Sequence, residues 1–88
     1  MEKFTTYILF SKKNGRFYIG HTNDCDHRFA QHNNKENPST KNGVPWIKIF
    51  NEEFMTRSEA MKKELYIKKR GAKRFLEDIN HDLTFFKN

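Results

Sequence analysis

The sequence predicts one small α/β domain (α+β) built from three short strands and three helices. Three observations support this class. At 88 residues the chain is too short for two independent hydrophobic cores. Two apolar runs alternate with the period of a strand and are separated by a turn sequence, and the segments after them carry helix-capping signals and helical periodicity. The chain is therefore expected to be a single mixed domain.

The first two strands are expected to form a hairpin. Residues 4–10 are rich in β-branched and aromatic side chains, with positions 4, 6, 8 and 10 alternating with positions 5, 7 and 9 as in a strand. "KKNG" supplies an Asn-Gly turn, and "RFYIG" at 16–20 resumes the strand pattern. A loop with an even number of residues would place Tyr7 and Tyr18 on the same face of the hairpin, and this is the arrangement we expect. Both tyrosines could also be simple packing residues, because tyrosine is favoured in strands.

A helix is predicted over residues 25–33, "CDHRFAQHN". Cys25 and Phe29 mark its inward stripe. Arg28 and His32 stand four residues apart along the border of that stripe, so they are expected to point toward one place. The alternative is a solvated helix edge with no further role.

Three more elements are predicted in the second half of the chain. "WIKIF" at 46–50 has the composition of a third strand. A long helix is expected over 57–70, because Thr56 and Glu59 have the spacing of a capping box. A short helix over 72–79 follows, and the aromatic residues of the C-terminal tail are expected to pack back on the domain.

The long helix places charge on its apolar side. Glu64 and Lys68 fall within an arc that also contains apolar residues, namely Ala60, Met61, Leu65 and Ile67. In one interpretation they form a self-neutralising ion pair below a partly open edge. In the other, the carboxylate points into a cleft and holds a hard cation, because Mg²⁺ takes one or two protein carboxylates and completes its shell with water and phosphate.

Charge and cysteine content narrow the classes of partner and compartment. The net charge of +6 and the isoelectric point of about 9.6, with Lys and Arg spread along the chain, favour a polyanionic partner such as nucleic acid. A solvated basic surface is the alternative. One cysteine, no signal-peptide pattern and no long apolar run predict a cytoplasmic protein without a membrane span. His27, His81 and Cys25 lack the spacing of zinc ligands, so no structural zinc site is expected.

A set of polar residues occurs in a recognisable order: Tyr7, the triplet Tyr18-Ile19-Gly20, Arg28, His32 with Asn33, and Glu64 on a later helix. In this order and spacing the chain resembles the GIY-YIG nuclease superfamily, in particular its small single-domain members. The resemblance covers about residues 4–72, with the last helix and tail at 73–88 outside it. "TTY" replaces Gly-Ile-Tyr in the first triplet and keeps only the tyrosine.

The resemblance implies a three-stranded antiparallel sheet flanked by helices and metal-dependent hydrolysis of a nucleic-acid phosphodiester. Glu64 would anchor one Mg²⁺ or Mn²⁺. Tyr18 would position or deprotonate the attacking water, and Arg28 would stabilise charge on the phosphate. The remaining roles are a phosphate contact or proton transfer by Tyr7, a phosphate contact or proton relay by His32, and substrate binding by Lys68, His21 and Asn33.

Three functions remain open on these residues. The first is a divalent-metal-dependent endonuclease acting on DNA, either structure-specific or weakly sequence-specific because no zinc-finger or helix-turn-helix pattern accompanies the motif. The second is a catalytically inactive module that binds nucleic acid. The third is a small basic protein-interaction domain, which assigns no special role to Glu64. His21 is expected in an exposed loop from which it could reach phosphate.

Overall fold

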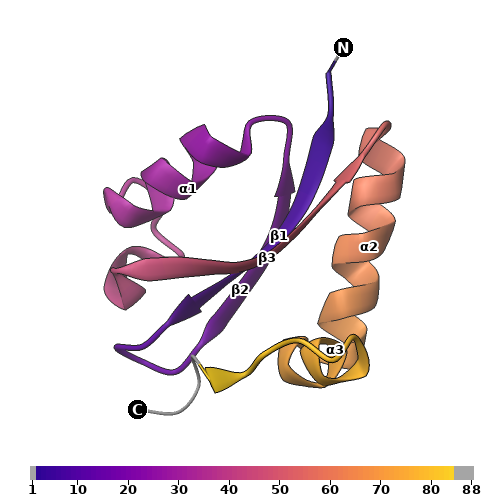
Figure 1. The fold of residues 1–88 in the computed structure, drawn as a ribbon. Helices are drawn as coiled ribbons and strands as arrows, with labels where there is room; N and C mark the ends of the chain where they lie inside the picture. The colour runs from indigo at the N-terminus through magenta and orange to yellow at the C-terminus, as the bar shows by residue number, and fades with distance from the viewer. Residues whose placement is uncertain (1, 85–88) are drawn as a thin grey trace.

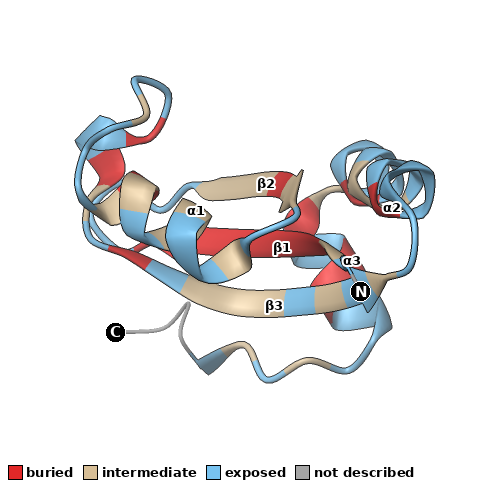
Figure 2. Cartoon of the chain, turned by 90° about the horizontal axis from the view of Figure 1, so that it is seen from above, coloured by how far each residue is buried: buried red, intermediate tan, exposed pale blue. Residues whose placement is uncertain are grey.

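The structure is a computed structural model that describes residues 2–84, and its centre is a three-stranded antiparallel sheet (Figure 1). The strands are β1 (Phe4–Ser11), β2 (Phe17–Thr22) and β3 (Trp46–Phe54), in the order β2-β1-β3. Strand β1 is therefore central, and Figure 2 shows it as a nearly continuous buried strip between its neighbours. The predicted fold, a three-stranded antiparallel sheet flanked by helices, is confirmed.

The hairpin places the two tyrosines on one face, as predicted. The Ser11 N–H donates to the Arg16 carbonyl at 3.0 Å, and Gly15 closes the turn with a φ of 70°, which glycine adopts without strain. In the resulting register Tyr7 lies opposite Gly20, and Leu9 lies opposite Tyr18. Directly paired residues share a face, so the Tyr7 and Tyr18 rings are neighbours, with centroids 6.2 Å apart.

The helices divide between the two faces of the sheet (Figure 1). Helix α1 (Cys25–Asn33) covers the face of Tyr7, where Leu9 and Trp46 are buried and Phe29 packs against them. Helices α2 (Arg57–Arg70) and α3 (Ala72–Asp78) cover the face of Ile8, where Ile67, Phe75 and Leu76 complete the core. Three α3 residues, Ala72, Phe75 and Leu76, are buried in this cluster, so the short last helix is part of the packed core.

Helix α2 begins at the predicted capping box, in which Thr56 accepts from the Glu59 N–H and the Glu59 side chain returns to the Thr56 N–H. Its predicted apolar arc is partly wrong. Ala60 and Ile67 are fully buried, whereas Met61 and Leu65 are 51% and 55% exposed. At about 100° per residue these two lie roughly 100° and 140° around the axis from Ala60, beyond the narrow line of the helix that touches the sheet.

The other differences concern the ends of elements. Strand β2 runs on to Thr22 and β3 to Phe54, both beyond their predicted ends, and a short 3-10 helix, η1 (Lys41–Gly43), interrupts the loop before β3. In the tail, Leu83 packs against the core beneath α3, while the aromatic residues at 85 and 86 lie outside the described residues. Within residues 2–84, none of the helices combines the length and apolarity needed to cross a bilayer.

Candidate active site

The two tyrosines of the sequence signature meet above Gly20. A Cβ atom added to Gly20 would lie 2.7 Å from the Tyr7 hydroxyl oxygen and 3.2 Å from Cε2 of Tyr18. Those distances are too short for any side chain to fit unless the rings move. Glycine at this position of β2 therefore lets the Tyr7 hydroxyl lie directly across the strand, which is the physical reason for the third residue of "YIG".

Behind the tyrosines, His32 is fully buried and both of its ring nitrogens have partners. Nε2 lies 3.1 Å from the Tyr7 hydroxyl and Nδ1 lies 2.8 Å from Oγ1 of Thr40, whose hydroxyl in turn is 3.4 Å from the Asn37 carbonyl. Burial, together with the positive charge of Arg28, lowers the pKa of His32 to about 4, so the ring is neutral near pH 7.

One arrangement of protons satisfies every group in this chain. The Thr40 hydroxyl donates to the Asn37 carbonyl and accepts from Nδ1–H of His32, which leaves Nε2 to accept the Tyr7 proton. Burial, reinforced by Tyr18, raises the pKa of Tyr7 to about 12, so this hydroxyl keeps its proton near neutral pH. Because His32 has no exposed surface, its position suits a proton relay and gives no support to direct phosphate contact.

Arg28 reaches the tyrosines from α1, as the sequence predicts for its side of the helix. Partial burial acts to lower the pKa of Arg28, but the interactions with the Tyr7 and Tyr18 hydroxyls outweigh it and raise the pKa. One guanidinium nitrogen also donates to Gln31 at 3.2 Å. Arg28 and Tyr18 are both partly exposed. A permanent positive charge and a partly exposed tyrosine thus stand together on this face of the sheet.

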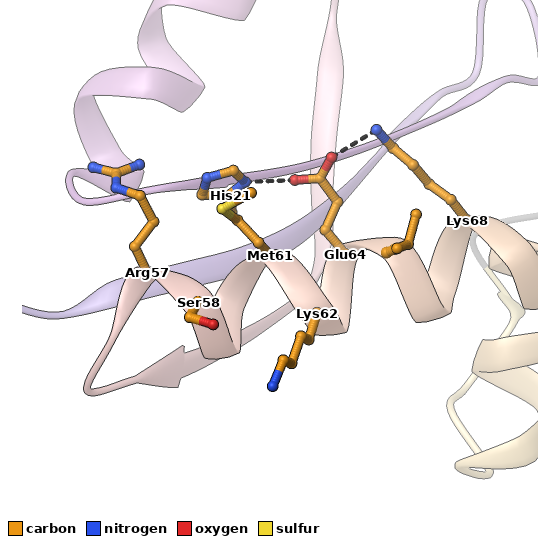
Figure 3. A pocket seen from close by; sticks show the side chains of 8 residues that line it. His21, Arg57, Ser58, Met61, Lys62, Glu64 and Lys68 are labelled. Atoms are coloured by element: carbon orange, nitrogen blue, oxygen red, sulfur yellow. Dashed lines mark hydrogen bonds and ion pairs between the residues drawn. The ribbon is translucent and has the colours of Figure 1, made fainter.

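Glu64 lies on the other face and is held by two partners, His21 and Lys68 (Figure 3). Its Oε1 is 2.6 Å from Nδ1 of His21, and its Oε2 accepts from Nζ of Lys68 at 2.6 Å. The predicted pair of Glu64 with Lys68 is therefore present. Burial alone would raise the pKa of this carboxyl, but the hydrogen bonds from Lys68 and His21 outweigh burial and lower it. The carboxylate is ionised at neutral pH.

His21 occupies a different place from the expected exposed loop. It belongs to β2, lies opposite Thr6, and turns toward α2, on the face away from Tyr18. The prediction failed because β2 continues beyond its glycine. His21 can still take part in substrate binding, but its immediate partner is Glu64.

The two halves of the site join around the free edge of β2. A hollow of about 480 Å³ contains Glu64, and a second hollow of about 310 Å³ contains Arg28. Both are lined by His21 and Arg57, so they adjoin. Arg57 was not singled out from the sequence. The available signal was a cation in the first turn of α2, where the helix dipole favours anions.

Asn33 has a structural role that sequence analysis did not foresee. Its amide oxygen accepts from the Trp46 N–H at 2.6 Å and its amide nitrogen donates to the Trp46 carbonyl at 3.1 Å, which joins the end of α1 to the start of β3. The Trp46 indole N–H also donates to the Thr40 carbonyl at 2.7 Å. With its amide engaged in this way, the geometry gives no support to a substrate contact by Asn33.

The donor set at Glu64 fits a hard divalent cation. Among residues 2–84, no three or more His, Cys, Asp or Glu side chains gather as a metal-binding cluster. Each Glu64 oxygen has one protein partner, and a carboxylate oxygen has about two lone-pair sites, so each retains capacity for a metal. Mg²⁺ is commonly held by one or two carboxylates together with water and substrate phosphate. Glu64 could supply the protein share of such a shell.

Comparison with known proteins gives a consistent family. Residues 3–78 match the GIY-YIG catalytic domain. A UPF0213 protein from Limosilactobacillus reuteri is 33% identical over 88 residues, covering 93% of this chain and 91% of the relative. A UPF0213 protein from Staphylococcus saprophyticus is 38% identical over 69 residues, covering 77% and 83%. The solution NMR structure of a UPF0213 protein from Bacillus halodurans has a TM-score of 0.58 and 26% identity, covering 98% of this chain and 94% of that one. The chain therefore belongs to the GIY-YIG catalytic domain family.

Proposed function

We propose that this protein is a divalent-metal-dependent endonuclease that hydrolyses DNA phosphodiester bonds. The family is one of nucleases, which supports the reaction class. The observation that carries the proposal is the convergence around the edge of β2. Arg28, which interacts with the Tyr18 hydroxyl, lines one hollow and Glu64 lines the other, and His21 and Arg57 line both. The net charge of +6 suits a polyanionic substrate.

Tyr18 and Tyr7 take different roles in this proposal. Tyr7 is buried, holds its proton and directs it to His32, so it is poorly suited to accept a proton from water. Tyr18 is partly exposed beside Arg28 and is the better candidate to position the attacking water and receive its proton. Tyr7 then orients Arg28 through a hydrogen bond, and the rings of Tyr7 and His32 pack against Tyr18.

Arg28 and Lys68 supply positive charge to the phosphate. The guanidinium of Arg28 has a planar set of donors that matches phosphate oxygens, and its pKa is raised, so it remains charged throughout. Lys68 is half-exposed and bonds only one oxygen of Glu64, so its ammonium can turn to a phosphate oxygen when substrate binds. These contacts favour the extra negative charge of the transition state.

Glu64 would hold the metal, which we propose to be Mg²⁺ or Mn²⁺. A cation bound there supplies Lewis-acid polarisation of the phosphate and charge stabilisation at the leaving oxygen. The contribution of the chain is to keep the carboxylate ionised, through Lys68 and His21, and to fix its direction. In the chain itself no zinc-finger or helix-turn-helix pattern accompanies this site, so we propose weakly specific or structure-specific cutting.

Replacing Tyr18 with phenylalanine tests the proposal. Tyr18→Phe keeps the ring that packs near His32 and removes the proposed proton acceptor, so DNA cleavage should fall by at least ~10²-fold. Tyr66→Phe is the matched control, because Tyr66 is 53% exposed on α2 with its ring against Phe75, on the face of the sheet opposite Tyr18. An unchanged cleavage rate in Tyr18→Phe would contradict the mechanism. Salt-dependent DNA binding without cleavage by the parent, with or without Mg²⁺ or Mn²⁺, would instead identify an inactive binding module.

A further inference from the structure

Two apolar side chains stand exposed beside Glu64. Met61 and Leu65 lie one turn apart on α2 and are 51% and 55% exposed. Both line the Glu64 hollow, in which Figure 3 shows Met61 extending toward His21. We call this pair the apolar shelf. Single exposed apolar residues are common on protein surfaces, but here a pair borders the proposed metal ligand.

Cationic side chains surround the apolar shelf. Arg57 and Lys68 lie along α2 on the two sides of Met61 and Glu64, and Lys62 also lines the hollow, although its side chain points away from Glu64 (Figure 3). A surface with an apolar floor, a positive rim and one carboxylate is complementary to a nucleotide, whose base is flat and weakly polar on its faces and whose phosphate is anionic.

The size of the apolar shelf suits a single ring system. A specific protein–protein interface covers about 800 Å² on each partner, far more than two half-exposed side chains provide. The hollow of about 480 Å³ instead falls within the range of small-ligand sites. A fully paired duplex would not use it, because its bases are stacked and only sugars, phosphates and base edges reach a protein surface.

We propose that the apolar shelf receives an unpaired nucleobase next to the phosphate bound at Glu64. The preferred substrate is then a nucleic-acid strand with at least one unpaired nucleotide at the cut site, such as a flap or a single-stranded region. This inference rests on the proposed function, because it takes Glu64 as the place where the scissile phosphate binds. Apolar side chains, including methionine and leucine, contact base faces where a base leaves the stack.

Binding measured without metal tests the inference separately from catalysis. Fluorescence anisotropy in EDTA would compare a flapped duplex with a series in which one nucleotide at a time across the junction is abasic, keeping its sugar and phosphate. For the parent protein, removal of one particular base should weaken binding by about five- to tenfold, as expected for losing contact with two apolar side chains. A fully paired duplex of the same sequence should bind no better than that abasic flap.

The matched variants are the double substitution Met61→Gln/Leu65→Gln and the control Met55→Gln. Glutamine keeps the length and helix propensity of these side chains, and both positions are more than half exposed, so folding should be little affected. Met55 is 57% exposed and lies outside the Glu64 hollow. The control should show the parent's dependence on the base, and the double variant should bind intact and abasic flaps equally.

Failure of the inference and failure of the proposed function give different results. If every abasic flap and the paired duplex bind the parent as tightly as the intact flap, or if the folded double variant keeps the parent's base dependence, the apolar shelf does not hold a base. If Mg²⁺-dependent cleavage is also unaffected by the abasic sites and by the double substitution, the protein is a nuclease but the apolar shelf does not bind a base. If binding depends on the base but no substrate is hydrolysed, the proposed nuclease function is wrong and base binding at the apolar shelf is supported.

Discussion

Replacing Glu64 with glutamine separates the structural contribution of its carboxylate from the chemical one. Glu64→Gln preserves the shape of the side chain and removes its charge, which His21 and Lys68 now contact at 2.6 Å each. If Glu64 holds the metal, cleavage should be abolished. Binding to DNA in EDTA should persist, because the phosphate contacts come from Arg28 and the lysines and a negative charge has been removed from the site.

The structure also sets the expected loss of stability. Lys68 is half-exposed, so its i,i+4 pair with Glu64 contributes only about 0.3–0.5 kcal/mol. The bond to His21 is more shielded, yet a glutamine oxygen can still accept from Nδ1–H, so only the charge-assisted part is lost. Together these give a loss of about 1 kcal/mol, or a fall in melting temperature of about 4–8 °C for a domain of this size.

The difference in stability between the parent and Glu64→Gln should also depend on pH, which provides a second measurement. The pKa of Glu64 is lowered from 4.5, because the hydrogen bonds outweigh burial. A carboxyl whose pKa is lower in the folded state stabilises the protein above its unfolded pKa, and this stabilisation disappears as pH falls through the folded value. The parent should therefore exceed Glu64→Gln in stability at pH 7 and lose that advantage progressively as pH falls below the ordinary glutamate pKa of 4.5.

A matched control removes a carboxylate from a different ion pair. Asp78 forms a two-bond pair with Arg70 at the C-terminal end of α2, outside both hollows and exposed to solvent, so Asp78→Asn should change stability only slightly and leave cleavage unchanged. Melting temperature, DNA binding and cleavage would be measured on both variants. A Glu64→Gln protein that is destabilised but still cuts at the parent's rate would refute Glu64 as the metal ligand and leave it as an ion-pair residue.

Three further predictions follow from the tyrosine face. Gly20→Ala should lower stability by about 1–3 kcal/mol in denaturant titrations, because its Cβ would lie 2.7 Å from the Tyr7 hydroxyl, and a fully stable variant would contradict that close approach. His32 is neutral and buried with a pKa of about 4, so the parent should lose about 3 kcal/mol of stability between pH 6.5 and pH 4, as unfolded chains take up the proton, and His32→Gln should flatten this dependence. Thr40→Val should leave Nδ1–H of His32 without an acceptor and cost about 1–3 kcal/mol, whereas Thr40→Ser should restore stability and the ring ¹⁵N shifts of the Nδ1–H tautomer; equal behaviour of the two variants would exclude the assigned proton arrangement.

Local patterns were sufficient for the parts of the site that lie within one element or one hairpin. The Asn-Gly turn predicted a hairpin, in which a loop with an even number of residues puts Tyr7 and Tyr18 on one face, and helix spacing placed Arg28 and His32 on one side of their helix. The capping box at Thr56 likewise fixed the start of α2. These features depend on residues that are close in the sequence, so the spacing of those residues is enough to predict them.

Contacts between distant elements could not be derived in the same way. The bond from His21 to Glu64 depends on where β2 ends and how α2 rotates against the sheet, and the segment after Gly20 shows no local sign that the strand continues. The same rotation exposes Met61, although helical periodicity placed it in the apolar arc. A helix that touches a sheet along a narrow line buries fewer positions than its apolar stripe suggests.

The place of Thr6 on the central strand has a further consequence for how the site is kept in alignment. Its buried hydroxyl donates to the Ala60 carbonyl of α2 at 2.8 Å, while the next residue, Tyr7, points to the opposite face and meets His32. The register of β1 therefore sets the positions of both the Glu64 helix and the tyrosine network. An insertion that slipped β1 by one residue would exchange the two faces, and would therefore separate α2 and the tyrosine network from their contacts with β1 at the same time.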